Sequence, residues 1–346
     1  MYEIVVISGK GGTGKTTVCS AFAHLMDNGI ICDLDVDAPD MHIICGPQVH
    51  EKYDFISGQE AAINEDFCLS CGVCMAHCKF DAINLKGGAY TVDPLRCEGC
   101  GVCEAMCPMS SGGGQASAIS TPQASAISMP QSAAISTPQA QAISTSQASA
   151  ICMHNKHCGD WYESESRFGP MIHAQLFPGE ENSGRLVSLL KLKAKERAKA
   201  SGLDFILCDG SPGIGCPVIS SLAGARLAVA VVEPTPSGRH DFTRVADLCD
   251  HFRIPVNVVI NKATLNEAEC ASIREFCASR GYDIVAEIPF CHDVYEAMMQ
   301  RKALTELQSE AADLVRSAWG KIMAKAESAK ADDAAKKARP ISLKSL

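Results

Sequence analysis

The stretch that decides the fold of this chain is Ser8-Gly9-Lys10-Gly11-Gly12-Thr13-Gly14-Lys15-Thr16-Thr17. It matches the phosphate-loop pattern G-x-x-x-x-G-K-[ST], with a strand-like apolar run from Ile4 to Ile7 before it and an apolar-periodic helix from Val18 to Met26 after it. In such a loop the backbone N–H groups gather on an anion, the lysine reaches the β- and γ-phosphates, and the Thr16 hydroxyl suits Mg²⁺. Because strand, loop, Lys15 and helix agree, the sequence predicts a site for ATP and Mg²⁺ rather than a bare glycine-rich turn.

The composition restricts the class of protein. The chain has 346 residues, of which 47% are apolar, and this fits a large α/β core with a smaller addition. No run of about eighteen apolar residues occurs, and the first strand-like segment begins at Glu3, so we expect a cytoplasmic protein with no signal peptide and no membrane anchor. Nineteen cysteines in a long cytosolic chain indicate metal or redox chemistry. The net charge of −9 argues against a general nucleic-acid binder, because counterion release requires a basic face.

A second buried strand is predicted from Ile30 to Cys32, and an acidic segment follows it. That segment is Asp33-Leu34-Asp35-Val36-Asp37-Ala38-Pro39-Asp40. Carboxylates at the carboxyl end of a strand beside a phosphate loop can hold Mg²⁺ or its waters and can orient an attacking water. A solvated acidic loop is the alternative that these residues leave open.

Two cysteine runs follow after about Ser57, where the alternation of strands and helices stops. The first is Cys68-x₂-Cys71-x₂-Cys74-x₃-Cys78, and the second is Cys97-x₂-Cys100-x₂-Cys103-x₃-Cys107-Pro108. Each is typical of bacterial ferredoxins, in which the fourth cysteine of one run ligates the cluster of the other. The sequence therefore predicts two 4Fe–4S clusters, one held by Cys68, Cys71, Cys74 and Cys107, and one held by Cys97, Cys100, Cys103 and Cys78.

One position departs from the ferredoxin pattern. Lys79 stands where proline usually follows the fourth cysteine, which removes a rigid turn and adds a positive charge near a cluster. A zinc ribbon would carry two C-x₂-C pairs rather than two runs of four cysteines, so we favour iron–sulfur ligation.

Residues 115–154 consist of five eight-residue units, QASAISTP, QASAISMP, QSAAISTP, QAQAISTS and QASAICMH. With no aromatic residue and one isoleucine in each unit, the segment buries little apolar area against its ordering entropy. We expect a flexible linker over residues 113–157, with a β-solenoid as the alternative. Cys and His residues at 152–158 could bind an ion, but they match no standard ligand spacing.

The α/β pattern resumes with a helix predicted from Ser183 to Ala200. An apolar strand from Leu203 to Cys208 follows and ends in Asp209-Gly210-Ser211-Pro212-Gly213. An aspartate at a strand end before a glycine turn fits a Walker B site, which holds Mg²⁺ through water. A stripe of lysines at helical spacing along the helix predicts a solvated face: Lys191, Lys195 and Lys199.

Three more strands are predicted at residues 227–232, 255–260 and 284–288. Asn261 follows the second of these strands, and its side-chain amide can pair with an adenine edge. Pro289 follows the third and is a candidate wall for the base. An amphipathic helix from 304 to 323 is expected to close the core.

The succession of strands and helices predicts a doubly wound parallel sheet that binds ligands at the carboxyl ends of its strands. We expect a P-loop ATPase domain in two segments, residues 1–57 and 158–325, that share one sheet. Residues 58–112 are then an inserted small α+β domain of the bacterial ferredoxin type. Residues 326–346 form a Lys/Ala-rich tail.

The motif K-G-G-T-G-K-T-T, which begins at Lys10, resembles the deviant Walker A signature of the MinD, ParA and nitrogenase iron protein superfamily. Together with the twin cysteine runs and Asp209-Gly-Ser-Pro-Gly-Ile-Gly-Cys216-Pro217, it resembles the members that carry an inserted ferredoxin domain and are related to Mrp-type iron–sulfur carriers. The resemblance implies a homodimer in which Lys10 reaches the nucleotide phosphates of the partner. It also implies that Asp35 positions the attacking water and that Asn261 recognises the base. Cys216, near the implied dimer face, is either a ligand to a bridging metal or a packed thiol.

These features predict a dimeric Mg-ATP-dependent ATPase, with Lys10, Lys15, Asp35 and Asp209 as catalytic residues, whose nucleotide state is coupled to a two-cluster ferredoxin module. Its output is either ATP-gated electron transfer to a redox partner or the assembly of a metal–sulfur cofactor on a client metalloprotein. A MinD- or ParA-like positioning or scaffold protein, in which the clusters are structural or sensory, is the alternative. The residues do not identify the client.

Overall fold

The computed structural model of the protein describes residues 1–110 and 149–338. The chain divides into two compact units, Met1–Phe55 with Cys158–Leu346, and Ile56–His157. We call the first the sheet unit and the second the cysteine unit. Most of the octapeptide segment, up to residue 148, lies outside the described residues.

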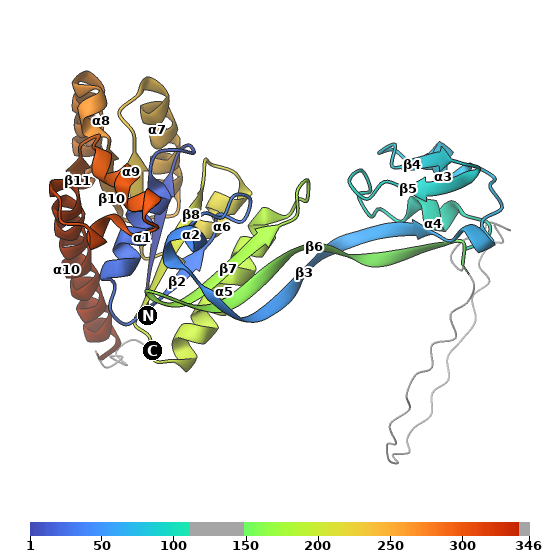
Figure 1. The fold of residues 1–346 in the computed structure, drawn as a ribbon, viewed down its shortest axis with the longest axis horizontal. Helices are drawn as coiled ribbons and strands as arrows, with labels where there is room; N and C mark the ends of the chain where they lie inside the picture. Colours follow the sequence, from blue (N-terminus) through green and yellow to red (C-terminus); the bar gives the residue numbers. More distant parts are fainter. Residues whose placement is uncertain (111–148, 339–346) are drawn as a thin grey trace, which may run out of the picture. The chain divides into compact units, whose positions relative to one another are not determined.

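A nine-stranded sheet with the order β11-β10-β9-β1-β8-β2-β7-β6-β3 organises the sheet unit (Figure 1). Neighbouring strands from β11 across to β7 are parallel, whereas β6 pairs with β7 in the antiparallel direction. The predicted α/β parallel-sheet fold is therefore confirmed, and a mixed edge is added to it. The strands are β1 (Tyr2–Ser8), β2 (Gly29–Asp33), β3 (Gln48–Ile63), β6 (Ile151–Ser166), β7 (Gly169–Leu176), β8 (Phe205–Pro212), β9 (Leu227–Val232), β10 (Val256–Asn261) and β11 (Asp283–Ile288).

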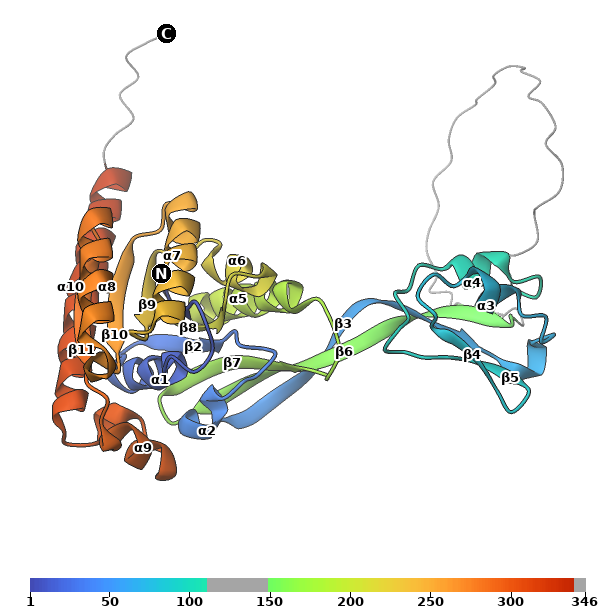
Figure 2. The same cartoon turned by 90° about the horizontal axis from the view of Figure 1, so that it is seen from above.

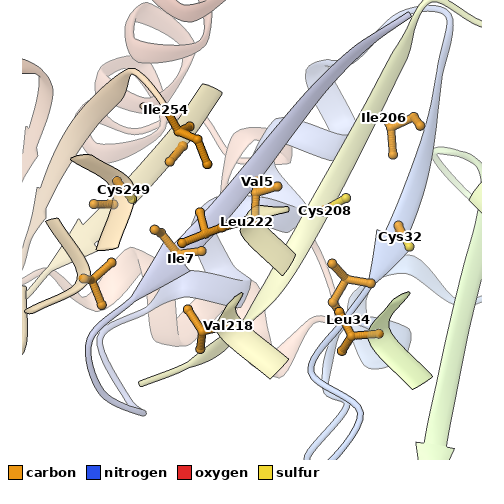
Figure 3. Packing of buried hydrophobic residues seen from close by; sticks show 14 of the residues in the cluster. Val5, Ile7, Cys32, Leu34, Ile206, Cys208, Val218, Leu222, Cys249 and Ile254 are labelled. Carbon is orange, nitrogen blue, oxygen red and sulfur yellow. The ribbon is translucent and has the colours of Figure 1, made fainter. Parts of the chain in front are cut away.

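Helices cover both faces of this sheet (Figure 2). One face packs against α5, α6, α7 and α8, and the other against α1, α2 and α10. Figure 3 shows the first face, where Val5 and Ile7 of β1 lie near Leu222 and Val218 of α6. The helices are α1 (Lys15–Leu25), α2 (Met41–Cys45), α5 (Ser183–Ala200), α6 (Cys216–Leu222), α7 (Pro236–His251), α8 (Glu267–Arg280), α9 (His292–Met299) and α10 (Glu310–Ala338).

Lys191 in the lysine stripe of α5 is buried, which corrects the sequence prediction of a solvated face at this position, whereas Lys199 is exposed as predicted. The Lys191 side chain is only 5% exposed, and its Nζ lies 2.6 Å from Glu3 Oε1. Lys191 also donates to the carbonyl oxygens of Ser221 and, at 2.8 Å, Ala223 at the end of α6, while Lys195 lies 2.9 Å from Glu3 Oε2. A buried carboxylate in β1 therefore holds Lys191 inside the protein and pairs with the partly exposed Lys195, a partner that helical spacing alone could not reveal.

The cysteine unit contains two short helices and a hairpin. Helix α3 (Val73–His77) begins after Gly72, and α4 (Val102–Met106) begins after Gly101; both glycines have φ above 70°. Strands β4 (Ile83–Lys86) and β5 (Ala89–Val92) pair in the antiparallel direction around the turn at Gly87 and Gly88. The two cysteine runs thus fold into the same local structure, a glycine turn followed by one and a half turns of helix.

Two predicted boundaries differ from the structure. The linker was expected to continue to residue 157, but strand β6 begins at Ile151, so the last octapeptide ends inside a strand. The closing helix was expected from residue 304, but Leu304–Glu306 is a separate 3₁₀ helix and α10 begins at Glu310. Helix α10 then runs to Ala338, well into the predicted tail.

His173 on β7 gives a testable pH dependence. Burial lowers the pKa of this half-buried histidine from 6.5 to about 4. Below pH 6.5 the unfolded chain therefore binds a proton at His173 that the folded chain does not bind. The contribution of His173 to the free energy of unfolding is fully present above pH 6.5 and decreases between pH 6.5 and 4, by at most about 3 kcal/mol. We expect His173→Gln to flatten this part of the stability curve in urea unfolding measured from pH 7 to 4.5.

The matched control is His240→Gln, because the side chain of His240 is 72% exposed. It should leave the wild-type slope unchanged. An equal slope in the wild type and in His173→Gln would contradict the assignment of this pH dependence to His173.

Candidate nucleotide site and cysteine cavities

The phosphate loop connects the carboxyl end of β1 to the first turn of α1. Gly12 and Gly14 have φ values of 77° and 91°, which favour glycine because a Cβ is strained there. A Cβ on Gly14 would also lie 2.2 Å from the Asn261 side-chain nitrogen, and one on Gly9 would lie 2.5 Å from the backbone of Asp241. These glycines therefore let the loop fit between β10 and α7 and present its turn at the start of α1.

Lys15 and Thr16 both contact Asp209, the predicted Walker B residue. Lys15 Nζ donates to Asp209 Oδ1 at 2.8 Å, and Thr16 Oγ1 donates to Asp209 Oδ2 at 2.7 Å. Lys15 Nζ also lies 3.4 Å from Asp35 Oδ2. The structure thus brings together four of the side chains that the sequence proposed for phosphate and Mg²⁺ binding.

This group of side chains contains more carboxyl groups than ammonium groups. Burial would lower the pKa of Lys15, but the carboxylates of Asp209 and Asp35 raise it above its ordinary value. Burial, reinforced by Asp209, raises the pKa of Asp33 well above its usual range, and burial also raises the pKa of Asp35. The site thus has three carboxyl groups and one ammonium group, and Asp33 Oδ2 is buried without a hydrogen-bond partner among the described residues. Such a set of oxygen ligands fits a divalent cation such as Mg²⁺.

Lys10 lies against the loop between β9 and α7 of its own chain. Its Nζ is 3.2 Å from Thr235 Oγ1, 3.3 Å from Ser237 Oγ and 3.5 Å from Glu233 Oε2. The Lys10 side chain is 28% exposed. The lysine that the sequence assigns to a partner's phosphates is thus held here by an intrachain carboxylate and two hydroxyl groups.

Asn261 and Pro289 lie at the ends of neighbouring strands. Asn261 is buried, and its side-chain nitrogen donates to the carbonyl oxygen of Thr13 at 2.7 Å, so in this structure the amide supports the phosphate loop. Lys262 donates to the carbonyl oxygen of Gly12 at 3.0 Å. Pro289 directly follows β11, at the same edge of the sheet.

Each cysteine set predicted from the sequence lines one cavity of the cysteine unit. A cavity of about 340 Å³ is lined by Cys68, Cys71, Cys74 and Cys107, and its wall includes Tyr90. A second cavity of about 360 Å³ is lined by Cys78, Cys97, Cys100 and Cys103. The fourth cysteine of each run thus reaches the cavity formed by the other run.

The surroundings of these thiols suit thiolate ligands. Backbone N–H groups of Ser70, Ala82 and Ala61 point at the sulfur atoms of Cys68, Cys78 and Cys97, at distances of 3.4 to 3.5 Å. Burial raises the pKa of Cys74 and Cys103, and neighbouring cysteines of the same set contribute to the increase. Four convergent sulfur donors with N–H···S contacts in each cavity fit a 4Fe–4S cluster.

Cys216 is separate from both cavities. It is exposed at the first position of α6, directly after the glycine-rich turn that follows β8. A Cβ on Gly184 at the start of α5 would lie 3.1 Å from Cys216 Cβ, so the two helices meet closely at this point. Within the part of the chain that the structure describes, no other cysteine, histidine or carboxylate completes a metal-binding group with Cys216.

The sequence did not identify the residues that hold Lys10, and it did not single out Asp33 from the acidic segment that follows β2. Glu233 could have been noticed because it follows β9 directly, and strand ends on this edge carry the other site residues. Asp33 pairs in register with Asp209 across β2 and β8. That register brings two aspartates side by side, which no spacing along the chain can indicate.

A parallel sheet with a phosphate loop after β1, a buried aspartate on β8 and acidic residues after β2 defines a P-loop nucleotide-binding protein. The family model for the CobQ/CobB/MinD/ParA nucleotide binding domain matches residues 4–304. The chain therefore belongs to this family. In the described residues, no helix combines the length and apolar character needed to cross a bilayer.

Among curated proteins, the protein MJ0578 of Methanocaldococcus jannaschii is 29% identical over 323 residues, which cover 92% of this chain and 96% of that protein. Two solved structures are similar at lower identity. The cell division ATPase MinD of Pyrococcus furiosus is 14% identical with a TM-score of 0.48, over 93% of this chain and 98% of that one. MinD in the MinC:MinD complex of Aquifex aeolicus is 15% identical with a TM-score of 0.49, over 94% and 96%. The family assignment therefore depends on the family model.

Lys15→Ala tests the nucleotide site. Removing the ammonium eliminates a charged phosphate contact and leaves the carboxylates of Asp209, Asp33 and Asp35 unbalanced, so we expect ATP affinity to fall by roughly 30- to 100-fold, corresponding to about 2 to 3 kcal/mol. Titration with a fluorescent ATP analogue measures this loss. Lys199→Ala, an exposed lysine on α5, is the control and should bind like the wild type. Undiminished binding by Lys15→Ala would refute the site.

Proposed function

We propose that this protein is a dimeric Mg-ATP-dependent ATPase that couples its nucleotide state to two 4Fe–4S clusters in the cysteine unit. The observation that carries the proposal is the pair of cavities, each lined by the four cysteines that the ferredoxin pattern assigns to one cluster. Membership of the nucleotide-binding family supports the ATP part. The biological output is either electron transfer to a redox partner or assembly of a metal–sulfur cofactor on a client metalloprotein.

The nucleotide chemistry follows from the contacts around Lys15. Lys15 and the first turn of α1 hold the phosphates, while Thr16 and Asp209, whose oxygen atoms already lie 2.7 Å apart, would hold Mg²⁺. Bound Mg²⁺ supplies charge neutralisation at the phosphates. Asp35 lies beside Lys15 and is partly exposed, so it can accept a hydrogen bond from an attacking water. Asn261 and Pro289 are the proposed contacts for the base.

The cysteine unit supplies the redox part. A bound 4Fe–4S cluster exchanges one electron at a time. The N–H contacts to Cys68, Cys78 and Cys97 stabilise thiolate charge, and buried apolar neighbours such as Tyr90 and Ile83 limit water around the sulfur atoms. These residues are therefore suited to hold two clusters and to adjust their potentials.

The homodimer is proposed from Lys10. Its contacts with Glu233, Thr235 and Ser237 are hydrogen bonds and an ion pair at a partly exposed side chain, which are weak enough to exchange for phosphate oxygens. Lys262 lies 3.7 Å from Glu233 and would still balance that carboxylate if Lys10 moved away. Cys216, exposed at the start of α6, is a candidate ligand to a metal shared by the two subunits.

A MinD- or ParA-like positioning or scaffold protein is the second candidate, and the family match favours it directly. In that case ATP would control binding to a partner, and the clusters would be structural or sensory. The response of the clusters to reductant and to ATP separates the candidates, because only the coupled ATPase requires clusters whose redox state is linked to the nucleotide.

Iron content tests the cysteine assignment. After anaerobic purification we expect about eight iron atoms per chain and a reduced-cluster signal in electron paramagnetic resonance. Cys71→Ser and Cys100→Ser each remove one exposed ligand from a different cavity, so each should lower the iron to about four per chain.

Cys152→Ser is the matched control for the iron measurement, since Cys152 lies in the same unit but lines neither cavity. It should retain the full iron content. A chain without iron would overturn the coupled function, and a cluster signal unchanged by reductant and by ATP would favour the scaffold.

Lys10→Ala tests the dimer. We expect the wild type to change from monomer to dimer in size-exclusion chromatography when a non-hydrolysable ATP analogue and Mg²⁺ are added. Lys10→Ala should bind the analogue but remain monomeric, because the contact to the partner's phosphates is lost. Dimer formation by Lys10→Ala at the wild-type concentration would contradict the proposed role, and Lys199→Ala is the control.

A further inference from the structure

A second cavity of the sheet unit lies away from the phosphate loop. It opens beside the last turn of α5, where Figure 1 shows this helix running along β2 and β7. Its floor is apolar, formed by the fully buried side chains of Ile30, Met171 and Ile172. Ile30 lies near the amino end of β2, whereas Asp33 ends that strand at the nucleotide site. The cavity is therefore at the opposite edge of the sheet from the nucleotide site.

Opposite charges face this cavity without pairing to each other. Arg197 of α5 and Glu163 of β6 both line it, yet among the described residues neither has an ion-pair partner within 4.0 Å. Lys193, one turn before Arg197, does have such a partner, Glu196 at 2.8 Å. Glu163 is placed by its pairing with Ile172, which lies in the floor. A half-buried carboxylate and a guanidinium are thus held apart across an apolar surface.

Two further polar side chains surround the cavity. Glu51 of β3 lines it and accepts a hydrogen bond from the hydroxyl of Tyr53. Glu163 of β6 lines the same cavity, so both carboxylates face it. His50 is an exposed member of the lining. The cavity therefore offers two carboxylates, Glu51 and Glu163, to a positive group of a ligand, and Arg197 to a negative group.

We propose that this cavity binds a small zwitterion with an apolar side chain, of the chemical class of the aliphatic α-amino acids. Arg197 can hold the ligand carboxylate through two parallel N–H···O bonds, and Glu163 with Glu51 can accept hydrogen bonds from the ammonium. The side chain of the ligand would then cover Ile30 and Ile172. The mixture of an apolar floor with few convergent polar groups is typical of small-molecule sites.

Other ligand classes fit less well. A simple anion would satisfy Arg197 but would face two carboxylates, and an amine would satisfy the carboxylates but leave Arg197 without a partner. A nucleotide would bring several negative charges toward Glu51 and Glu163. Only a ligand with both charges on neighbouring atoms and an apolar remainder uses every side of the cavity.

Isothermal titration calorimetry on the purified full chain tests this site. The probes are L-leucine and L-methionine, together with 4-methylpentanoate, which lacks the ammonium, and 3-methylbutylamine, which lacks the carboxylate. We expect saturable binding of an amino acid and binding at least tenfold weaker for both analogues. Arg197→Gln and Glu163→Gln should each weaken amino-acid binding by tenfold or more.

Lys199→Gln is the matched control, because Lys199 is exposed on the same helix and does not line the cavity. It should bind like the wild type. Circular dichroism of each variant checks that Arg197→Gln and Glu163→Gln, both at positions with solvent contact, retain the fold. Because these positions are remote from Lys15, ATP binding should be unchanged in both variants.

Three results would overturn the proposal. The first is the absence of a saturable heat of binding with either amino acid up to about 10 mM, a concentration above the largest dissociation constant that we expect for such a site. The second is binding of 3-methylbutylamine as tight as that of L-leucine, which would identify a cation site. The third is unchanged affinity in the Arg197→Gln Glu163→Gln double variant.

Discussion

The buried ion pair between Lys15 and Asp209 is the constraint on which the candidate site depends. Its 2.8 Å contact joins the phosphate loop to β8, in a region where neither side chain is appreciably exposed. A buried charge without a partner costs several kcal/mol, so the loop, β8 and the acidic segment after β2 must fold together. The remaining carboxyl groups, Asp33 and Asp35, lie beside this pair and would be available as oxygen ligands to a cation.

The sheet positions the side chains around this pair, and helices cover both faces of the sheet. Asp33 and Asp209 meet because β2 and β8 are parallel and in register. Helix α6 begins just after the glycine turn that follows Asp209, and its far end is held by Lys191, which is itself paired with Glu3 of β1. The far end of α6 is therefore connected to β1 through the buried side chains of Lys191 and Glu3.

Much of the cysteine unit could be predicted from the sequence, because ligand spacing is a local property. The C-x₂-C-x₂-C turns require glycine at Gly72 and Gly101, and the structure begins a helix after each. The exchange of Cys78 and Cys107 between the two runs also follows from the ferredoxin pattern, and each lines the cavity expected for it. Whether these cavities hold iron stays a prediction.

The sequence by itself determined the strand–loop–helix motif at Lys15, the parallel sheet and the helix Ser183–Ala200, because backbone propensity, apolar periodicity and glycine turns act over a few residues. Only the tertiary structure decided that Lys191 is buried, that Lys10 binds Glu233, and that Arg197 and Glu163 share a cavity. Each of these depends on a partner from a distant segment. The free energy of a charged side chain is set by what surrounds it after packing, and sequence spacing does not contain that information.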